Sequence, residues 1–433
     1  MNRVRCARHG LAVGVVGILV VLTGCSSSSS SSSGGAPAGA GAPTGSGKTH
    51  VLTVASVAFS QLFGDYMPAI KARFAQANSG HEIPGYSLNY QGLIDDQYSV
   101  AGAVAAFREA NEQDHVFAVV GNQSPLPPTA YVNQNHLPVI GGGASQSYCP
   151  GNASQSSYFF SPYGCQGVGG SSDYYLNLGQ PAAAAVGGGA GKTAACVGED
   201  FPNGAQYTAS LCGSLHAAGF TVDLKDNSIP APPAAVSDFS PYVQKIMTAN
   251  SGKPVDVVGL TTSGTTGGLA SALRRAGFKG LIIGGLGYSQ AQTAAQTGVT
   301  QYINTASPMS ASSNPQMKTI VDALVAAGVP ANKISAATLQ GWFAADMFVK
   351  IAQKTAASGP LTQERFAQTA RTFTYQIPEV VGPTTYPTAF QAPTPCSELD
   401  QSNGTEWKVL RPYTCDEVFD VKTGSFVKYA DVK

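Results

Sequence analysis

The feature that most constrains the fold is an alternation, from His50 onward, of short apolar runs with longer segments of helical periodicity. Several runs consist of consecutive Val, Ile and Leu residues, which is typical of strands covered on both faces. Strand–helix alternation of this kind predicts parallel sheets with helices on both sides. The predicted strands are Val51–Val57, Tyr86–Tyr90, Val116–Val120, Pro138–Ile140, Ala194–Gly198, Val255–Leu260 and Leu281–Gly284.

The alternation occurs twice, at about 50–160 and about 190–300, and a chain of 433 residues exceeds what one hydrophobic core usually covers. Two further helices follow, and then a Pro- and Cys-rich tail. The tail ends in a predicted hairpin of Val418–Val421 and Phe426–Tyr429. The predicted fold class is therefore α/β, with two doubly wound parallel-sheet lobes.

The first residues are typical of an export signal. Arg3, Arg5 and Arg8 precede an uncharged apolar run that is too short for a membrane span of about 20 residues. The run ends in Leu22-Thr23-Gly24-Cys25, which resembles the bacterial lipobox, where the Cys is acylated and the chain is cut before it. The sequence predicts a signal peptide over 1–24 and lipidation of Cys25. The alternative is an ordinary secretory signal with a chance Cys.

A tether is predicted over 25–48. Ser26–Ser33 is followed by Gly, Ala and Pro to about Gly47, with no apolar periodicity and almost no charge. Such a segment cannot bury enough apolar surface to fold. Together with Cys25, it predicts an extracytoplasmic protein anchored by lipid to the outer face of the cell membrane.

The charge and histidine content exclude several classes of partner. The net charge is zero, 12% of residues are charged, and no Lys/Arg cluster follows the signal. Nucleic acid is therefore not an expected partner. The six His residues have no ligand spacing, so neither a metal site nor another cofactor is expected.

Six cysteines remain beyond Cys6 and Cys25. An even number in an exported chain favours three disulfides, for which 15 connectivities exist. We expect sequential pairing because each pair then brackets one short segment. The alternative for the middle pair is two separate buried thiols, one on a strand and one on the next helix. The cysteines are Cys149, Cys165, Cys196, Cys212, Cys396 and Cys415.

No motif predicts an enzyme. Gly187–Thr193 and Gly45–Thr49 are similar to a phosphate-binding loop but lack its leading glycine. The first also precedes a predicted strand, whereas a phosphate loop follows one. A Gly-x-Ser-x-Gly nucleophile elbow does not occur in the sequence.

Several short segments stand in a distinctive order along the chain: Ile94–Tyr98, Val116–Gly121, Leu137–Ile140, Ala194–Gly204, Ser237–Ser240, Val255–Val258, Ala276–Phe278 and Ile283-Gly284. This order resembles type I periplasmic binding proteins, and most closely the leucine/isoleucine/valine-binding branch of ABC transporter receptors. The resemblance covers about 50–375. It implies two doubly wound lobes with a ligand cleft at the carboxyl ends of their strands.

The resemblance also implies three crossings between the lobes, and from it we predict lobe boundaries. Lobe 1 is expected to comprise 49–160 plus 306–383, and lobe 2 to comprise 161–305 plus 384–433. The crossings are expected near Tyr158–Gly167, Tyr302–Pro308 and Gly382–Phe390.

In the first lobe, the resemblance implies four ligand-binding positions. Phe63 matches an aromatic that packs on the ligand side chain, although a core role is an equal alternative. Ser124 is the residue nearest in sequence to the family position whose hydroxyl binds the ligand carboxylate. Ala144 and Ser145 match a loop whose backbone and hydroxyl hold the carboxylate and ammonium groups.

In the second lobe, Phe201 and Asn203 occupy the loop in which the family has a Tyr, and Thr262 stands where another aromatic is expected. Leu286 stands where the family places a Glu that pairs with the ligand ammonium. Because a buried ammonium without a carboxylate is costly, a less charged ligand becomes the better expectation. An amide, an aromatic or aliphatic acid, or another small metabolite would fit.

The resemblance therefore implies the solute-binding lipoprotein of an ABC importer. It would capture a small polar or amphipathic metabolite, such as a branched-chain amino acid or a related compound, as a monomer that delivers it to a membrane permease. One alternative is a ligand-sensing receptor for a signalling partner. A second is an exported hydrolase.

Overall fold

The computed structural model describes residues 49–166, 172–200, 204–232, 234–262, 264–284 and 288–432. Residues from Lys48 to Lys433 form one compact unit. The predicted signal peptide, the predicted lipidation site Cys25 and the predicted tether lie outside the described residues.

The first sheet has five parallel strands in the order β2-β1-β3-β4-β5. Strand β1 is buried along most of its length and pairs on both sides, Val54 with Tyr90 and with Ala118. The strands are β1 (His50–Ala58), β2 (Tyr86–Asp95), β3 (Ala118–Asn122), β4 (Val139–Gly141) and β5 (Phe159–Phe160).

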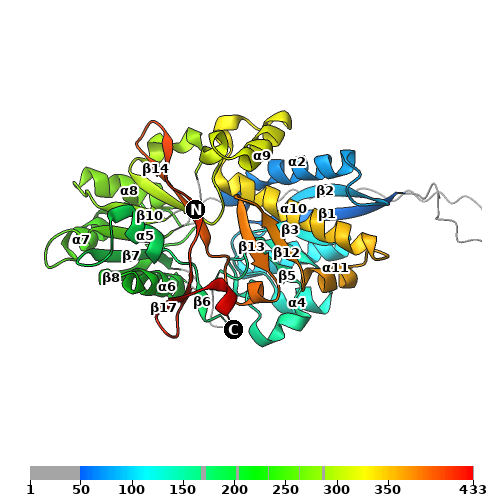
Figure 1. The fold of residues 1–433 in the computed structure, drawn as a ribbon, viewed down its shortest axis with the longest axis horizontal. Coiled ribbons are helices and arrows are strands. Elements are labelled where there is room, and N and C mark those ends of the chain that lie inside the picture. Colours follow the sequence, from blue (N-terminus) through cyan, green and yellow to red (C-terminus); the bar gives the residue numbers. More distant parts are fainter. Residues whose placement is uncertain are drawn as a thin grey trace, which may run out of the picture. The chain divides into compact units, whose positions relative to one another are not determined.

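Helices from two distant parts of the chain cover this sheet (Figure 1). The long helix α10 packs against α2 and over β3 and β4, and it is buried nearly all round, which explains its apolar sequence. The helices are α1 (Ser60–Phe63), α2 (Tyr66–Ser79), α3 (Val100–Arg108), which continues into a π-helical turn (Glu109–Gln113), α4 (Thr129–Gln134), α9 (Pro315–Ala326), α10 (Ala336–Ala357) and α11 (Gln363–Ala370).

The second sheet has seven strands in the order β15-β14-β11-β10-β9-β7-β8. Strands β7 to β11 are parallel, and β14 and β15 extend the sheet antiparallel. The strands are β7 (Thr193–Asp200), β8 (Thr221–Pro230), β9 (Val257–Thr261), β10 (Leu281–Gly284), β11 (Val299–Ile303), β14 (Cys396–Ser402) and β15 (Trp407–Cys415). Its helices are α5 (Gly179–Val186), α6 (Gly204–Ala217), α7 (Ser240–Thr248) and α8 (Thr266–Arg275).

Two small sheets complete the fold. The predicted C-terminal hairpin is confirmed as β16 (Val418–Asp420) and β17 (Ser425–Val427), which adds to β6 (Tyr174–Tyr175). A second hairpin joins β12 (Thr374–Ile377) to β13 (Val381–Thr385). Short 3₁₀ turns lie at Gln146–Tyr148, Gly151–Ser156, Gln290–Gln292, Ala294–Gln296, Pro308–Ser312, Ala331–Lys333, Thr388–Phe390 and Tyr429–Asp431.

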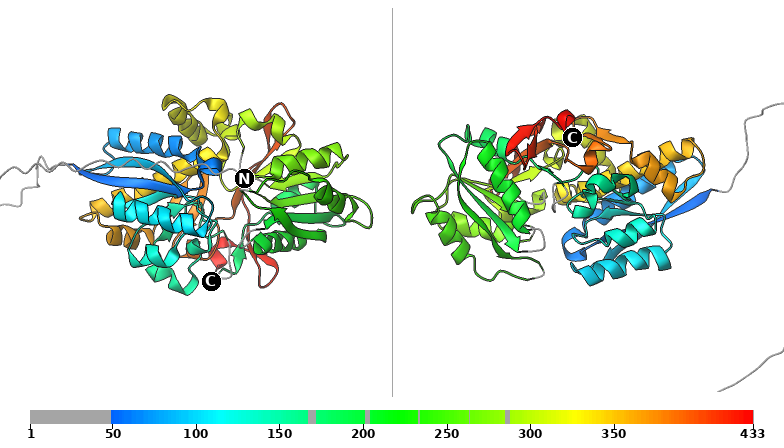
Figure 2. Two further views of the ribbon diagram at one scale, coloured as in Figure 1. Left: turned by 180° about the vertical axis from the view of Figure 1, so that it is seen from behind. Right: turned by 90° about the horizontal axis from the view of Figure 1, so that it is seen from below.

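The architecture confirms the predicted α/β class with two doubly wound, mainly parallel sheets. Figure 2 shows the sheet of β1–β5 and the sheet of β7–β10 as separate helix-covered units. The chain passes between them three times: after β5, after β11 and after β13. The boundaries given above for the lobes stay predictions.

Three disulfides join the six cysteines in sequential order, Cys149 to Cys165, Cys196 to Cys212 and Cys396 to Cys415. The alternative of two separate thiols at Cys196 and Cys212 is therefore wrong: α6 packs on β7 and brings the two side chains together.

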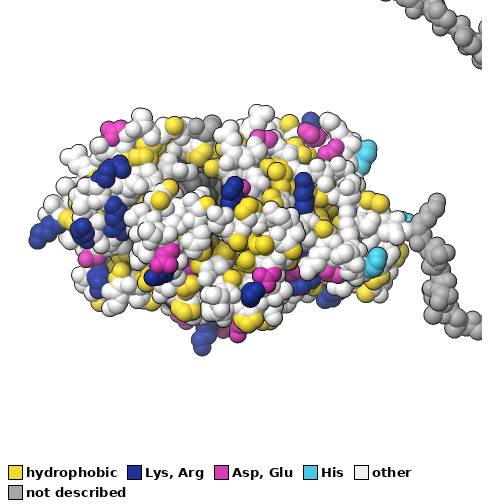
Figure 3. Space-filling view, turned by 90° about the horizontal axis from the view of Figure 1, so that it is seen from above, with side chains coloured by type: hydrophobic (Ala, Val, Ile, Leu, Met, Phe, Trp, Pro, Cys, Tyr) yellow, Lys and Arg dark blue, Asp and Glu magenta, His cyan; other side chains and the backbone are white. Residues whose placement is uncertain are grey.

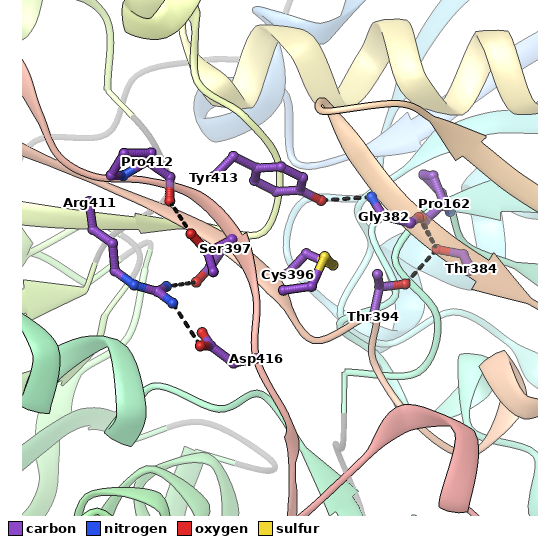
Figure 4. Close-up of a disulfide and its surroundings, with 12 residues drawn as sticks. Pro162, Gly382, Thr384, Thr394, Cys396, Ser397, Arg411, Pro412, Tyr413 and Asp416 are labelled. Carbon is purple, nitrogen blue, oxygen red and sulfur yellow. Dashed lines mark hydrogen bonds and ion pairs between the residues drawn. A yellow bond between two sulfur atoms is a disulfide. The ribbon is translucent and has the colours of Figure 1, made fainter.

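Figure 4 shows the third disulfide at the last passage between the sheets. The backbone N–H of Gly382 donates a hydrogen bond to the Tyr413 hydroxyl over 2.6 Å, and Thr384 donates to the carbonyl of Pro162 over 2.6 Å. These bonds tie β13 both to β15 and to the first passage after β5.

Candidate functional site

A cavity of about 270 Å³ opens where strands of both sheets end. The segments that follow β3, β9 and β11 contribute Gln123, Thr262 and Asn304, and α1 contributes Phe63. The carboxyl ends of parallel strands are where open α/β sheets bind ligands. The cavity is therefore the candidate site.

Three of the four predicted first-lobe positions line the cavity: Phe63, Ser124 and Ala144. Phe63 is half-buried and meets Tyr66 edge-on, with 5.4 Å between ring centroids, so it forms part of the wall rather than of the core. Ser145 is buried nearby but is not part of the lining. Its hydroxyl has no hydrogen-bond partner among the described residues.

One predicted second-lobe position, Thr262, also lines the cavity. Its hydroxyl lies 2.5 Å from that of Thr266, which fixes it at the start of α8. Phe201, Asn203 and Leu286 lie outside the described residues, so their predicted roles stay predictions.

Tyrosines dominate the wall, and the sequence reasoning missed all of them. They come from helices, strands and loops far apart in the chain, where a single Tyr carries the same signal as an ordinary core residue. Burial raises the pKa of the buried phenols, so these groups stay neutral. The lining tyrosines are Tyr66, Tyr98, Tyr148, Tyr175, Tyr207 and Tyr302.

One of these tyrosines connects the two sides of the cavity. Tyr207, on α6 beside the second sheet, donates a hydrogen bond to the carbonyl of Ala144, in the loop after β4 of the first sheet. Its ring also meets Tyr175 edge-on, at 5.9 Å between centroids. In the sequence, Tyr207 lies four residues after Asn203, which the resemblance aligned with the family's Tyr.

Amide side chains supply much of the polar part of the wall. The Gln340 Oε1 atom, from α10, accepts hydrogen bonds from Gln123 over 3.1 Å and from the Tyr66 hydroxyl over 2.8 Å. The Gln166 amide donates to the carbonyl of Gly142 over 2.5 Å. Nothing in the sequence pattern pointed to Gln340, because it lies more than 200 residues from Gln123.

The described lining carries no Asp, Glu, Lys, Arg or His side chain. Within the described ranges, no group of three or more His, Cys, Asp or Glu residues is placed to hold a metal ion. The structure thus provides hydrogen bonding and aromatic contact, without a described acid, base or nucleophile pair at the cavity.

Over the part of the chain that the structure describes, no helix is both long enough and apolar enough to cross a membrane. On the face drawn in Figure 3, acidic and basic side chains are scattered among neutral ones, as the zero net charge suggests.

Comparison with known proteins gives one family match. The sequence pattern of the family described as periplasmic binding protein matches residues 51–403. A search of curated proteins finds no significant match.

Many solved structures share the fold. An ABC transporter substrate-binding protein of Aeropyrum pernix has a TM-score of 0.68 and 14% identity, covering 85% of this chain and 96% of that one. A solute-binding protein of R. palustris in complex with 4-hydroxybenzoate has a TM-score of 0.67 and 15% identity, covering 84% of this chain and 97% of that one. A branched-chain amino acid ABC transporter protein of Thermus thermophilus with bound valine has a TM-score of 0.66 and 16% identity, covering 85% of this chain and 97% of that one.

Proposed function

The chain belongs to the periplasmic binding protein family, and on this premise we propose that it is the solute receptor of an ABC importer. The observation that carries the proposal is the cavity at the carboxyl ends of strands of both sheets, to which each side contributes hydrogen-bonding groups. Structures with this fold are described as ABC transporter proteins with bound 4-hydroxybenzoate or valine. A small organic solute is therefore the proposed ligand, and no chemical turnover of it is proposed.

Ligand capture would proceed by closure of two lobes around the cavity, with the lobe boundaries given above. A ligand favours the closed form only by its differential affinity for that form. The bond from Tyr207 to the carbonyl of Ala144 is one contact that would form on closure. A membrane permease would then recognise the closed, monomeric receptor.

We further propose that Cys25 is lipidated and that 25–48 acts as the tether. The basic, apolar and small-residue order of the first 25 residues supports this. The anchor would keep the receptor at the outer face of the membrane that contains its permease.

A thermal-shift screen of the full chain tests the receptor proposal, with amino acids, aromatic carboxylates, amides and sugars as probes. A ligand that binds the native state stabilises it by about 2.7 kcal/mol at a concentration 100 times its Kd. We expect at least one class to raise the melting temperature in a concentration-dependent way.

Matched variants show whether the cavity is responsible. Ala144→Trp places a large side chain in the cavity and should abolish the shift. Ala326→Trp adds the same side chain at an exposed position on α9 and should leave the shift intact. A screen in which no compound raises the melting temperature would contradict the receptor proposal.

A further inference from the structure

Building on the proposed receptor function, we propose that the ligand is an uncharged, single-ring aromatic compound that carries an amide or hydroxyl group. This class differs from the ionised 4-hydroxybenzoate and the zwitterionic valine bound by proteins of the same fold. Three features support it: the described lining carries no charge, tyrosines form much of the wall, and two paired amide side chains keep one donor and one acceptor for a ligand.

The lining offers no described charge to pair with an ionised ligand. The undescribed residues 167–171, 201–203, 233, 263 and 285–287 consist only of Gly, Val, Ser, Phe, Pro, Asn and Leu, so they add no ionisable side chain. Burial of a carboxylate or ammonium without a partner of opposite charge is costly. The charge of the ligand is therefore the first property that this cavity selects against.

Backbone N–H groups could otherwise bind a carboxylate, but three in the loops of the first sheet are already used. Gln123 N–H donates to the carbonyl of Val57 over 3.0 Å, and Gly142 N–H donates to the carbonyl of Asn122 over 3.1 Å. Ser124 N–H donates to the Asn122 side chain over 3.3 Å. These three N–H groups are therefore not available to an anion.

One buried acid lies directly behind the lining, and its ionised form would further disfavour an anion. Asp96 is wholly buried, and its carboxyl accepts the N–H of Tyr98 over 2.9 Å. It lies beside the Ser124 hydroxyl, with which it makes no well-directed hydrogen bond, and burial raises the pKa of Asp96.

The shape and composition of the walls suit one aromatic ring. Six tyrosines and Phe63 surround the cavity, and aromatic rings favour stacked or edge-on contacts with one another. An apolar cavity of about 150 Å³ can hold benzene. The volume of about 270 Å³ here leaves room for the ring and a polar substituent.

Gln123 and Gln340 define where that substituent would bind. Because Gln340 Oε1 accepts bonds from both Gln123 and Tyr66, the Gln340 amide nitrogen is left as a donor and Gln123 Oε1 as an acceptor. A primary amide or hydroxyl can satisfy both, since each donates and accepts. A carboxylate would use the donor but leave the acceptor unpaired, which costs binding energy.

A sugar would need more partners than the wall can supply. The Asn122 amide is bonded to the Tyr148 hydroxyl over 2.9 Å, and the Thr261 hydroxyl lies 3.1 Å from that of Thr208. Gln166 donates to a backbone carbonyl. With so many polar groups already paired, the buried hydroxyls of a sugar ring would be left partly unsatisfied.

Isothermal titration of the full chain at pH 7.5 tests the inference with probe pairs that differ only in charge. The pairs are benzamide with benzoate and 4-hydroxybenzamide with 4-hydroxybenzoate, and leucine and glucose are added as single probes. We expect at least one amide to bind at least tenfold more tightly than its carboxylate, leucine and glucose.

The other outcomes distinguish this inference from the receptor proposal. A carboxylate, leucine or glucose that binds as tightly as the amides or more tightly would overturn the uncharged aromatic ligand and leave the receptor proposal intact. A lack of binding by every probe would contradict the inference, and the broader thermal-shift screen would then decide separately on the receptor proposal.

A variant shows whether the amide pair sets this preference. Gln340→Leu should weaken binding of the preferred amide about tenfold. The ratio of the carboxylate Kd to the amide Kd should then fall towards one. Gln368→Leu, at an exposed position on α11, should change neither value. If Gln340→Leu fails to fold, Gln123→Met removes the acceptor instead. A preference unchanged in a folded variant would overturn the role of the pair.

Discussion

At the residue scale, Tyr207 gives the sharpest prediction about closure. Its hydroxyl joins α6 to the Ala144 carbonyl across the cavity. Tyr207→Phe keeps the ring and removes the bond, whose net contribution is about 0.5–1.5 kcal/mol. We expect ligand dissociation, measured by stopped-flow fluorescence, to become about two- to tenfold faster.

The control for this prediction is Tyr131→Phe. Tyr131 also uses its hydroxyl in hydrogen bonds, with Asn111 and Glu112, but it lies on α4 away from the cavity lining. Its dissociation rate should match that of the wild-type chain. A rate for Tyr207→Phe equal to the control would show that the bond does not stabilise the liganded form.

A second residue-scale prediction concerns a buried ion pair between α2 and α10. Arg73 is 5% exposed and donates hydrogen bonds to Asp346 over 2.8 Å and to Glu82 over 2.6 and 2.9 Å. Arg73→Met leaves the buried Asp346 without this partner, and loss of one member of a buried ion pair costs about 3–5 kcal/mol. Denaturant unfolding should show a loss of this size.

An exposed ion pair provides the comparison. Lys318 and Asp322 pair at i, i+4 on α9, and both are largely exposed. Because solvent screens such pairs, Lys318→Met should cost only about 0.5 kcal/mol or less. Equal losses for the two variants would mean that burial of Arg73 contributes nothing special to stability.

The site residues show what sequence can and cannot reveal at this scale. Phe63, Ser124, Ala144 and Thr262 were predicted from the family resemblance, and all four line the cavity, while their contact with a ligand stays a prediction. Tyr302 and Gln340 were not, because a residue within a strand or a long helix carries no local mark of facing a cavity. Their role depends on contacts between segments far apart in the sequence.

At the element scale, most of the predicted strands carry apolar runs, whereas β8 and β14 lack one and were missed. β8 alternates exposed and half-buried residues at the edge of its sheet, so it lacks an apolar run. β14 is almost wholly buried yet reads Cys-Ser-Glu-Leu-Asp-Gln-Ser. Its polar side chains are accommodated by hydrogen bonds to β11 and the following segment, which local sequence does not reveal.

The two acids of β14 give a prediction about pH. Glu398 and Asp400 are buried; Glu398 accepts the N–H of Ser307 over 3.1 Å, and Asp400 accepts the Gln301 amide over 2.9 Å. Burial raises the pKa of both carboxyl groups. The neighbouring Asp400 raises the pKa of Glu398 further, to about 8. The native state therefore holds a proton that the unfolded state releases near pH 4.5.

Because the native state binds more protons than the unfolded state between about pH 4.5 and 8, the free energy of unfolding should fall as pH rises through this range. The loss should be on the order of a few kcal/mol, since a tenfold difference in proton affinity corresponds to about 1.4 kcal/mol. Denaturant unfolding at pH 5.5, 7 and 8.5 measures it.

Glu398→Gln mimics the protonated form, so it should flatten this pH dependence and stabilise the protein at pH 8.5. Glu406→Gln, an exposed position beside Lys408, should keep the wild-type pH dependence. A wild-type profile that rises with pH, or a Glu398→Gln profile that matches the wild type, would contradict a proton held at this pair.

At the scale of the whole molecule, sequence predicted the class of fold but not the chemistry of its cavity. Two rounds of strand–helix alternation suffice to predict two doubly wound sheets, and the site at their carboxyl ends then follows from topology. The neutral, tyrosine-rich wall follows from neither, because it is assembled from both sheets and from α10. The departure at Leu286 was the one local sign of a less charged ligand.

The proposed anchor gives a prediction for the whole chain. The compact unit begins at Lys48, so a change at Cys25 should alter the location of the protein without altering its binding. Cys25→Ser removes the thiol that would be acylated. Without lipid on this residue, any remaining weak contact with the membrane would not anchor the protein stably. We expect loss of labelled-palmitate incorporation, a shift from the membrane to the soluble fraction, and an unchanged ligand Kd.

Cys6→Ser, within the predicted signal, should change none of these. Continued membrane association of Cys25→Ser would rule out lipidation as the anchor, whereas a changed Kd would mean that residues before Lys48 contribute to the site.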